Sequence, residues 1–144
     1  MAEGKALAYG HSYTANALGC AAAKASLEVF ENERVLEALQ PKIRHLGSAI
    51  AGLKELPGVK DVRQCGFIAG IETERAEMAA AVCIEARRHG LLTRPIWNVV
   101  VLMPPLCITM AQLTKAVEAL RAAIIEVWRC SNASERKDAE EVTA

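Results

Sequence analysis

Two short segments carry the side chains best suited to chemistry, and the first is Gly10–Asn16. It combines a glycine, several hydroxyl groups and backbone amides directly before a predicted helix. A helix N-terminus aims unpaired N–H donors and the positive end of its dipole at one place, which suits an anion such as a phosphate. Ser12 and Thr14 are equally typical of an ordinary turn or cap, and local chemistry alone favours that interpretation.

The second segment is Leu92–Ile96, in which Arg94 ends an apolar run and is followed by Pro95. A guanidinium group can hold a carboxylate through two parallel hydrogen bonds. The alternative is an edge-strand arginine in solvent or in a structural ion pair, which is more common for such a residue taken alone. The Met103–Leu106 segment contains two prolines at the end of a predicted strand. We expect these residues to have a structural role and not to bind a ligand.

Composition excludes several classes of partner. The 144 residues include 17 basic and 17 acidic side chains, so the formal net charge is zero and no nucleic-acid or membrane partner is expected. The apolar runs are too short to span a bilayer, and the first residues lack the pattern of a signal peptide. We therefore expect a cytoplasmic location.

Neither the cysteines nor the histidines indicate a metal site. The five cysteines form no C-x-x-C pair, which fits a reducing compartment and a structural role. His45 and His89 lie on or at the ends of predicted helices without acidic or cysteine partners at ligand spacing. We expect them to be solvated or to cap helices, and we expect no metal ligands in the chain.

The periodicity of apolar residues predicts an α+β fold with the order α-α-β-β-α-β-β-α. An antiparallel or mixed sheet covered by helices on one face fits this order. Asn16 is a good helix N-cap, Thr109 and Gln112 have the spacing of a capping box, and Pro41 should kink or restart the second helix. Residues 130–144 have no apolar face and are predicted to be disordered. The predicted helices are 16–31, 33–55, 75–89 and 109–129, and the predicted strands are 59–64, 67–72, 91–94 and 99–103.

Taken together, the two segments resemble class III pyridoxal-phosphate-dependent aminotransferases. Tyr9–Ala23 is similar to the segment at which these enzymes return from the large domain to the C-terminal one. Leu91–Ile96 and Asn98–Leu106 resemble the later segment of the branch that makes 7,8-diaminononanoate in biotin biosynthesis. The resemblance covers residues 5–129.

This resemblance implies that the chain is the C-terminal small-domain portion of a fold-type-I enzyme. Residues 1–31 would end the large domain and carry the cofactor-phosphate loop, and residues 32–129 would form the small domain. Ser12 and His11 would bind the phosphate of pyridoxal 5'-phosphate in the neighbouring subunit of a homodimer. Gly10 would line the substrate pocket, and Arg94 would bind the carboxylate of 8-amino-7-oxononanoate. The amino donor of this branch is usually S-adenosylmethionine.

The sequence also departs from the family pattern. The lysine that binds the cofactor lies upstream in this family, none of the lysines present stands in its context, and no catalytic residue is expected in the chain. We therefore expect the chain alone to be inactive. It would be a fragment, a truncated gene product or a decayed copy, and it would need a large-domain portion for activity. Trp97 stands where the family usually has glycine, and Pro41, Cys107 and Met110 are also unusual. The alternatives are part of another class III transaminase, acting on an ω-amino acid or a diamine, and a non-catalytic dimerisation module.

Overall fold

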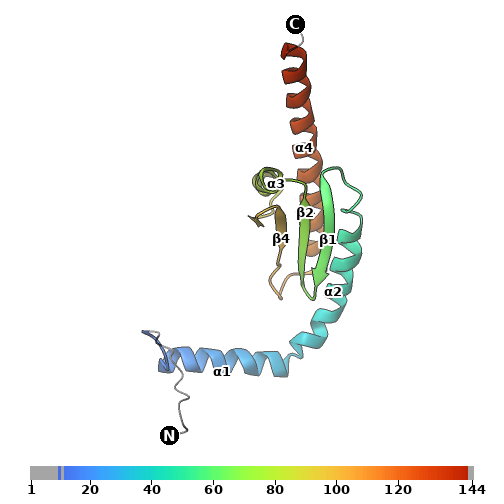
Figure 1. Cartoon of the computed structure of the whole chain (residues 1–144). Helices are drawn as coiled ribbons and strands as arrows, with labels where there is room; N and C mark the ends of the chain where they lie inside the picture. The colour runs from blue at the N-terminus through green and yellow to red at the C-terminus, as the bar shows by residue number, and fades with distance from the viewer. Residues whose placement is uncertain (1–9, 11, 143–144) are drawn as a thin grey trace, which may run out of the picture. The chain divides into compact units, whose positions relative to one another are not determined.

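The computed structural model describes residues 10 and 12–142, and the side chains of residues 10 and 12–132. The chain divides into two compact units, Met1–Ala38 and Leu39–Ala144. The first unit contains one complete helix and the start of the next, and the second contains the rest of that helix, the sheet and two further helices (Figure 1). The helices are α1 (Ala17–Asn32), α2 (Val35–Ala51), α3 (Ala76–Arg88) and α4 (Met110–Val142).

The second unit is built on a four-stranded antiparallel sheet with the order β1-β2-β4-β3. Its two hairpins, β1–β2 and β3–β4, are joined through α3, which places β4 beside β2. The α+β class and the order of elements predicted from the sequence are confirmed. The strands are β1 (Val59–Cys65), β2 (Ile68–Thr73), β3 (Arg94–Ile96) and β4 (Val99–Leu102).

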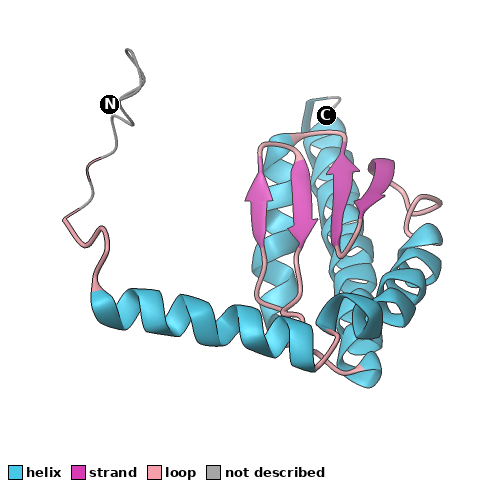
Figure 2. Cartoon of the chain, turned by 90° about the horizontal axis from the view of Figure 1, so that it is seen from below, coloured by secondary structure: helices cyan, strands magenta, loops and turns pink. Residues whose placement is uncertain are grey.

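One face of the sheet is buried against helices. Alternate residues of β2 and β4, among them Ile71 and Val100, are fully buried, as the two-residue repeat of a strand requires. Figure 2 shows α2, α3 and α4 on this face of the sheet. Burying each large aliphatic side chain contributes about 1.5–3 kcal/mol. The largest fully buried apolar side chains are Leu46, Leu53, Ile71, Val82, Val100, Leu113, Leu120 and Ile124.

Both predicted helix caps are present. The Asn16 side chain accepts a hydrogen bond from the Gly19 amide at 3.0 Å, so α1 begins where the sequence indicated. At the start of α4, the Thr109 amide donates to the Gln112 side chain at 2.9 Å. The Gln112 amide donates to the Thr109 hydroxyl at 3.2 Å. These reciprocal bonds satisfy helix-end donors that would otherwise have no partner.

Three boundaries differ from the predicted ones by three residues or more. Helix α2 ends at Ala51 rather than at residue 55. The third strand begins at Arg94 rather than Leu91, because the Leu91 amide bonds back to the Ala86 carbonyl at 2.9 Å to end α3. Helix α4 continues to Val142, where the sequence suggested a disordered tail from residue 130. No glycine or proline interrupts residues 110–142, and helix-forming alanine and charged residues are frequent there.

Proline 41 lies inside α2 without ending it. The helix runs from Val35 to Ala51, so Pro41 is in its interior and not in its first turn. Its missing N–H removes one bond of the helix ladder. In the described part of the chain, no helix is long and apolar enough to cross a membrane.

Candidate functional site

The first candidate segment forms a tight turn that leads into α1. The Asn16 amide donates to the Tyr13 carbonyl at 3.1 Å, and Ala15 takes a left-handed conformation with φ of 60°. Ser12 stands at the start of this turn and is exposed.

The start of α1 leaves two amide donors for a ligand. The Asn16 side chain takes the Gly19 amide, and the Cys20 amide bonds to the Asn16 carbonyl at 2.9 Å. Among the described residues, no acceptor faces the amides of Ala17 and Leu18. Two unpaired amides at the positive end of a 16-residue helix, with an exposed hydroxyl in the preceding turn, have the chemistry of an anion site.

The other residues predicted for this loop add little. His11 lies outside the described residues. Gly10 is exposed, and a Cβ atom built on it would meet nothing within 4 Å, so the space that a side chain would occupy is open. The roles of Gly10, His11 and Ser12 remain predictions.

Arg94 is the first residue of β3, where the strand is held firmly to its neighbour. Arg94 pairs with Val101 of β4, and the Thr93 hydroxyl donates to the Val101 carbonyl. The Arg94 side chain is exposed, and it has no hydrogen bond or ion pair with any residue that the structure describes. The alternative of a structural ion pair is therefore not realised within the described part of the chain.

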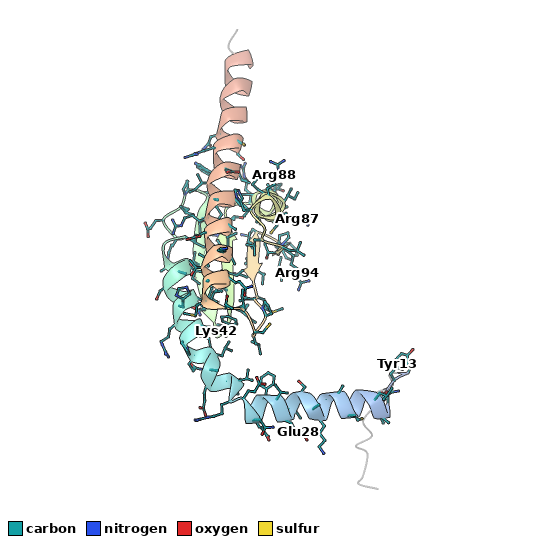
Figure 3. The ribbon with its side chains drawn as sticks, turned by 180° about the vertical axis from the view of Figure 1, so that it is seen from behind. Tyr13, Glu28, Lys42, Arg87, Arg88 and Arg94 are labelled. Atoms are coloured by element: carbon teal, nitrogen blue, oxygen red, sulfur yellow. The ribbon has the colours of Figure 1, made fainter. Side chains whose placement is uncertain are left out.

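A hollow of ≈ 660 Å³ lies beside Arg94. Its charged lining comes from Arg94 and from Arg87 near the end of α3, and Figure 3 shows both side chains on the same side of the unit. Its apolar lining includes three exposed side chains, Leu92, Ile96 and Met103. Two arginines beside the apolar side chains of this hollow match a ligand that carries a carboxylate on an aliphatic chain.

Trp97 forms the tip of the β3–β4 hairpin in a strained conformation. Its φ is 56°, a region that glycine enters freely and a bulky residue does not, and its side chain is 86% exposed. The neighbouring Asn98 fixes the turn, because its side-chain amide donates to the Thr73 carbonyl at 2.9 Å and its own carbonyl accepts from the Thr73 amide at 2.8 Å. Glycine, which the family resemblance led us to expect at this position, is the residue that this backbone conformation favours.

The open face of the sheet carries a network of ion pairs. Arg63 of β1 bonds to Glu72 of β2 at 2.7 Å, and this hydrogen bond lowers the pKa of Glu72 and raises that of Arg63. The pKa of Asp61 is lowered first by a hydrogen bond from the Val62 backbone. Lys60 lies 3.5 Å from Glu72. Each acid is balanced by a neighbouring base, so this network links two strands rather than offering an unpaired charge to a ligand.

Sequence reasoning missed the surroundings of His89. Its Nε2 atom lies 3.5 Å from Glu126 Oε2 and 3.9 Å from Glu85 Oε1, although no acidic partner was expected there. The Glu85–His89 spacing of four residues on one helix was a visible signal. Glu126 comes from α4 and is brought near only by the packing of α3 on α4. The other histidine, His45, bonds to the Thr114 hydroxyl at 2.8 Å.

The family model for class-III aminotransferases matches residues 1–124. Two bacterial proteins named adenosylmethionine-8-amino-7-oxononanoate aminotransferase are similar to the chain. That of Nitratidesulfovibrio vulgaris is 46% identical over 130 residues, which cover 83% of this chain and 24% of that protein. That of Geobacter sulfurreducens is 43% identical over 133 residues, which cover 85% of this chain and 29% of that protein.

Solved structures show the same similarity. The crystal structure of adenosylmethionine-8-amino-7-oxononanoate aminotransferase from Methanocaldococcus jannaschii is 41% identical, with a TM-score of 0.77, over 86% of this chain and 31% of that one. A transaminase solved with L-alanine shares the fold with a TM-score of 0.79 at 21% identity, over 86% of this chain and 32% of that one. The chain thus spans roughly a quarter to a third of the length of the proteins that it matches.

Proposed function

Because this chain belongs to the class-III aminotransferase family, we propose that it is the C-terminal part of a transaminase that converts 8-amino-7-oxononanoate to 7,8-diaminononanoate in biotin biosynthesis. The observation that carries the proposal is the identity of 41–46% with three proteins of that name, over at least 83% of the chain. S-adenosylmethionine is the proposed amino donor, as the names of these relatives imply. The complete enzyme is proposed to be a cytoplasmic homodimer.

The turn before α1 is proposed to hold the phosphate of pyridoxal 5'-phosphate. The Ser12 hydroxyl and the amides of Ala17 and Leu18 are donors without an acceptor among the described residues, and together they fit a phosphate group. His11, which lies outside the described residues, is also proposed to bind the phosphate, and Gly10 is proposed to line the substrate pocket. When bound, the cofactor supplies the electron sink for amino-group transfer. The chain's own residues contribute binding and charge neutralisation.

Arg94 is proposed to bind the carboxylate of the keto-acid substrate. A rigid, paired strand fixes its backbone, while its guanidinium has no partner among the residues described. The adjacent hollow offers Leu92, Ile96 and Met103 to the aliphatic chain of that substrate. Burial of this chain would add to affinity at about 0.8 kcal/mol for each methylene group that leaves water.

Proton transfer in the complete enzyme requires a lysine. We propose that this chain does not contain that lysine. In this interpretation the 144-residue chain needs a large-domain portion for activity, and the phosphate turn serves the cofactor of a neighbouring subunit. Borohydride reduction of the chain with pyridoxal phosphate tests this directly. Mass spectrometry of tryptic peptides should find no single stoichiometric pyridoxyl-lysine, and finding one would contradict the proposed division of the site.

A hybrid enzyme tests the substrate role of Arg94. The chain is joined to the part of the Nitratidesulfovibrio vulgaris relative that precedes the matched region, and the hybrid is assayed with the keto acid. We expect Arg94→Ala to reduce kcat/KM for the keto acid by about 30-fold or more, because truncating one partner of a desolvated charge pair costs about 2–5 kcal/mol. Cofactor affinity should be unchanged. Arg87→Ala is the matched control, with a smaller loss expected.

The same hybrid tests the phosphate turn. Ser12→Ala should weaken the retention of pyridoxal phosphate during dialysis, because the phosphate loses one charge-assisted hydrogen bond of about 1.5–3 kcal/mol. Thr14→Ala is the control in the same turn.

Equal losses of keto-acid use and cofactor binding in Arg94→Ala would argue against a substrate-carboxylate role. Rapid amino transfer from β-alanine or a diamine, but not from S-adenosylmethionine, would assign the chain to another branch of the family.

A further inference from the structure

Three side chains that are not among the residues proposed for cofactor or substrate binding converge between α3 and α4. Glu85 and His89 lie one turn apart at the end of α3, and Glu126 faces them from α4. The imidazole Nε2 and one oxygen of each carboxylate all lie within 4.8 Å of one another. The side chains of Glu85 and His89 are only 16% and 29% exposed, so this cluster is partly withdrawn from water.

The distances do not describe a pair of ordinary hydrogen bonds. His89 Nε2 lies 3.5 Å from Glu126 Oε2 and 3.9 Å from Glu85 Oε1, beyond the range of about 2.7–3.2 Å typical of N–H···O bonds. With metal–ligand distances of about 2.0–2.1 Å, two ligands of a tetrahedral ion lie about 3.3–3.4 Å apart. The His89–Glu126 separation is close to this value, the His89–Glu85 separation is longer at 3.9 Å, and the two carboxylate oxygens lie within 4.8 Å of each other. Glu126, whose side chain is 48% exposed, has room to close the remaining distance.

The surroundings hold the cluster in this arrangement. Arg88 bonds to Glu85 Oε2 at 3.0 Å, which fixes that carboxylate while its other oxygen, Oε1, faces His89. Outer contacts of this kind orient metal-binding carboxylates. The cluster also lies at the C-terminal end of α3, where the helix dipole favours a positive charge.

Space remains for water ligands. Glu85 and Glu126 line a hollow of ≈ 550 Å³, and His89 lines another of ≈ 580 Å³. An ion bound by one imidazole and two carboxylates could complete its coordination from these hollows. Imidazole with carboxylate oxygen is a donor set that Zn²⁺ accepts, whereas Mg²⁺ and Ca²⁺ prefer oxygen alone.

We propose that Glu85, His89 and Glu126 form a binding site for a divalent transition-metal ion, with Zn²⁺ as the best-matched ion, that ties α3 to α4. The site is independent of the proposed transaminase chemistry. Two helices joined by one ion lose freedom to separate, so the ion stabilises the second unit without taking part in catalysis.

Zinc titration of the untagged 144-residue chain tests the site, with isothermal calorimetry at pH 7.5 in a non-chelating buffer. We expect one Zn²⁺ per chain and a higher Tm when zinc is present. His89→Gln and Glu126→Gln should each weaken binding at least tenfold and abolish the rise in Tm. His45→Gln is the matched control, because His45 is bonded to Thr114 instead, and it should bind zinc normally.

A thiol control separates this site from the exposed cysteines. Cys130 lines the same hollow as Glu126, so Cys130→Ser is titrated in parallel and should keep full affinity. Co²⁺ bound to the chain should show visible d–d bands without a thiolate charge-transfer band. Zinc binding that survives both His89→Gln and Glu126→Gln, or that disappears in Cys130→Ser, overturns the proposal. So does the absence of binding at millimolar zinc.

Discussion

Gly58 and Gly90 offer a matched pair that separates backbone strain from side-chain packing. Both take left-handed conformations, with φ of 78° and 82°. A Cβ atom on Gly90 would meet nothing within 4 Å. On Gly58 it would lie 2.5 Å from Met78 Cε and 2.7 Å from Trp128 Cε3, so the turn between α2 and β1 is pressed against α3 and α4. Alanine at the two positions therefore carries the same backbone cost and a different packing cost.

The size of each effect follows from these contacts. A residue other than glycine in the left-handed region costs about 1–2 kcal/mol, which is the whole effect expected for Gly90→Ala. Gly58→Ala adds overpacking, which costs about 1–3 kcal/mol. The end of Met78 can turn away, but the rigid indole ring of Trp128 cannot, so part of the clash must remain. We expect Gly58→Ala to lower the free energy of unfolding by about 2–5 kcal/mol, a large fraction of the 5–15 kcal/mol typical of a domain.

Urea unfolding followed by far-UV circular dichroism measures both variants against the parent chain. The two variants should differ by at least 1 kcal/mol at an unchanged m-value. Gly66→Ala gives a second control, since its φ is 55° and its Cβ would also meet nothing within 4 Å. Equal costs for Gly58→Ala and Gly90→Ala, within about 0.5 kcal/mol, would refute the packing of this turn against α3 and α4.

Three further changes probe the sheet and the last helix. Thr73→Val should cost about 0.5–1.5 kcal/mol, because valine removes a buried hydroxyl donor that lies within 3.0 Å of the Arg75 and Asn98 carbonyl oxygens, while backbone amides still donate to both oxygens. Glu72→Gln should remove the stabilisation that the charged Glu72 carboxylate gains from Arg63. This stabilisation is fully present above the pKa of Glu72 in the unfolded chain. It is lost as the pH falls through the lower pKa of Glu72 in the folded chain. Thr109→Ala should cost about 0.5–2 kcal/mol by removing the cap of α4.

Each of these has a measurable contrary outcome. Thr73→Val that unfolds at the parent's urea midpoint would mean that the hydroxyl contributes nothing. For Glu72→Gln, thermal unfolding is compared with the parent from pH 3 to pH 7, and a constant difference in Tm across that range would rule out the charge pair. For Thr109→Ala, the comparison is Thr109→Ser, which keeps a hydroxyl that can accept the hydrogen bond from the Gln112 amide and should therefore lose little stability. Equal losses in both would argue against a specific cap.

The sequence by itself was enough for the elements and their class. Asn16 and the Thr109–Gln112 pair act within three residues, so the bonds that start α1 and α4 could be inferred from spacing alone. Leu39, Leu46 and Ile50 recur at helical spacing and are buried on one face of α2, because the helical repeat fixes which side chains share a face. The similarity to class-III aminotransferases was visible in the Gly10–Asn16 and Leu91–Leu106 segments, and the family model confirms it.

Local patterns did not decide the boundaries at which two interactions compete. Leu91–Thr93 has the composition of a strand, yet the Leu91 amide is used to close α3, and pairing begins only at Arg94. The sequence after residue 129 lacks an apolar face, yet its helix-forming residues continue α4 to Val142. In both cases the hydrogen bonds of a neighbouring helix extend past the boundary that hydrophobicity alone predicted.

Which distant residues meet depends on how the elements pack. The pairing of β2 with β4, rather than with β3, depends on the path of α3 across the sheet, which no local spacing encodes. Glu126 reaches His89 because α4 packs on α3, some forty positions further along the chain. Helix caps and the faces of a helix depend on residues a few positions apart, so they can be predicted from the amino-acid sequence. Contacts between elements depend on how complete faces fit together, so they appear only when the whole core is assembled.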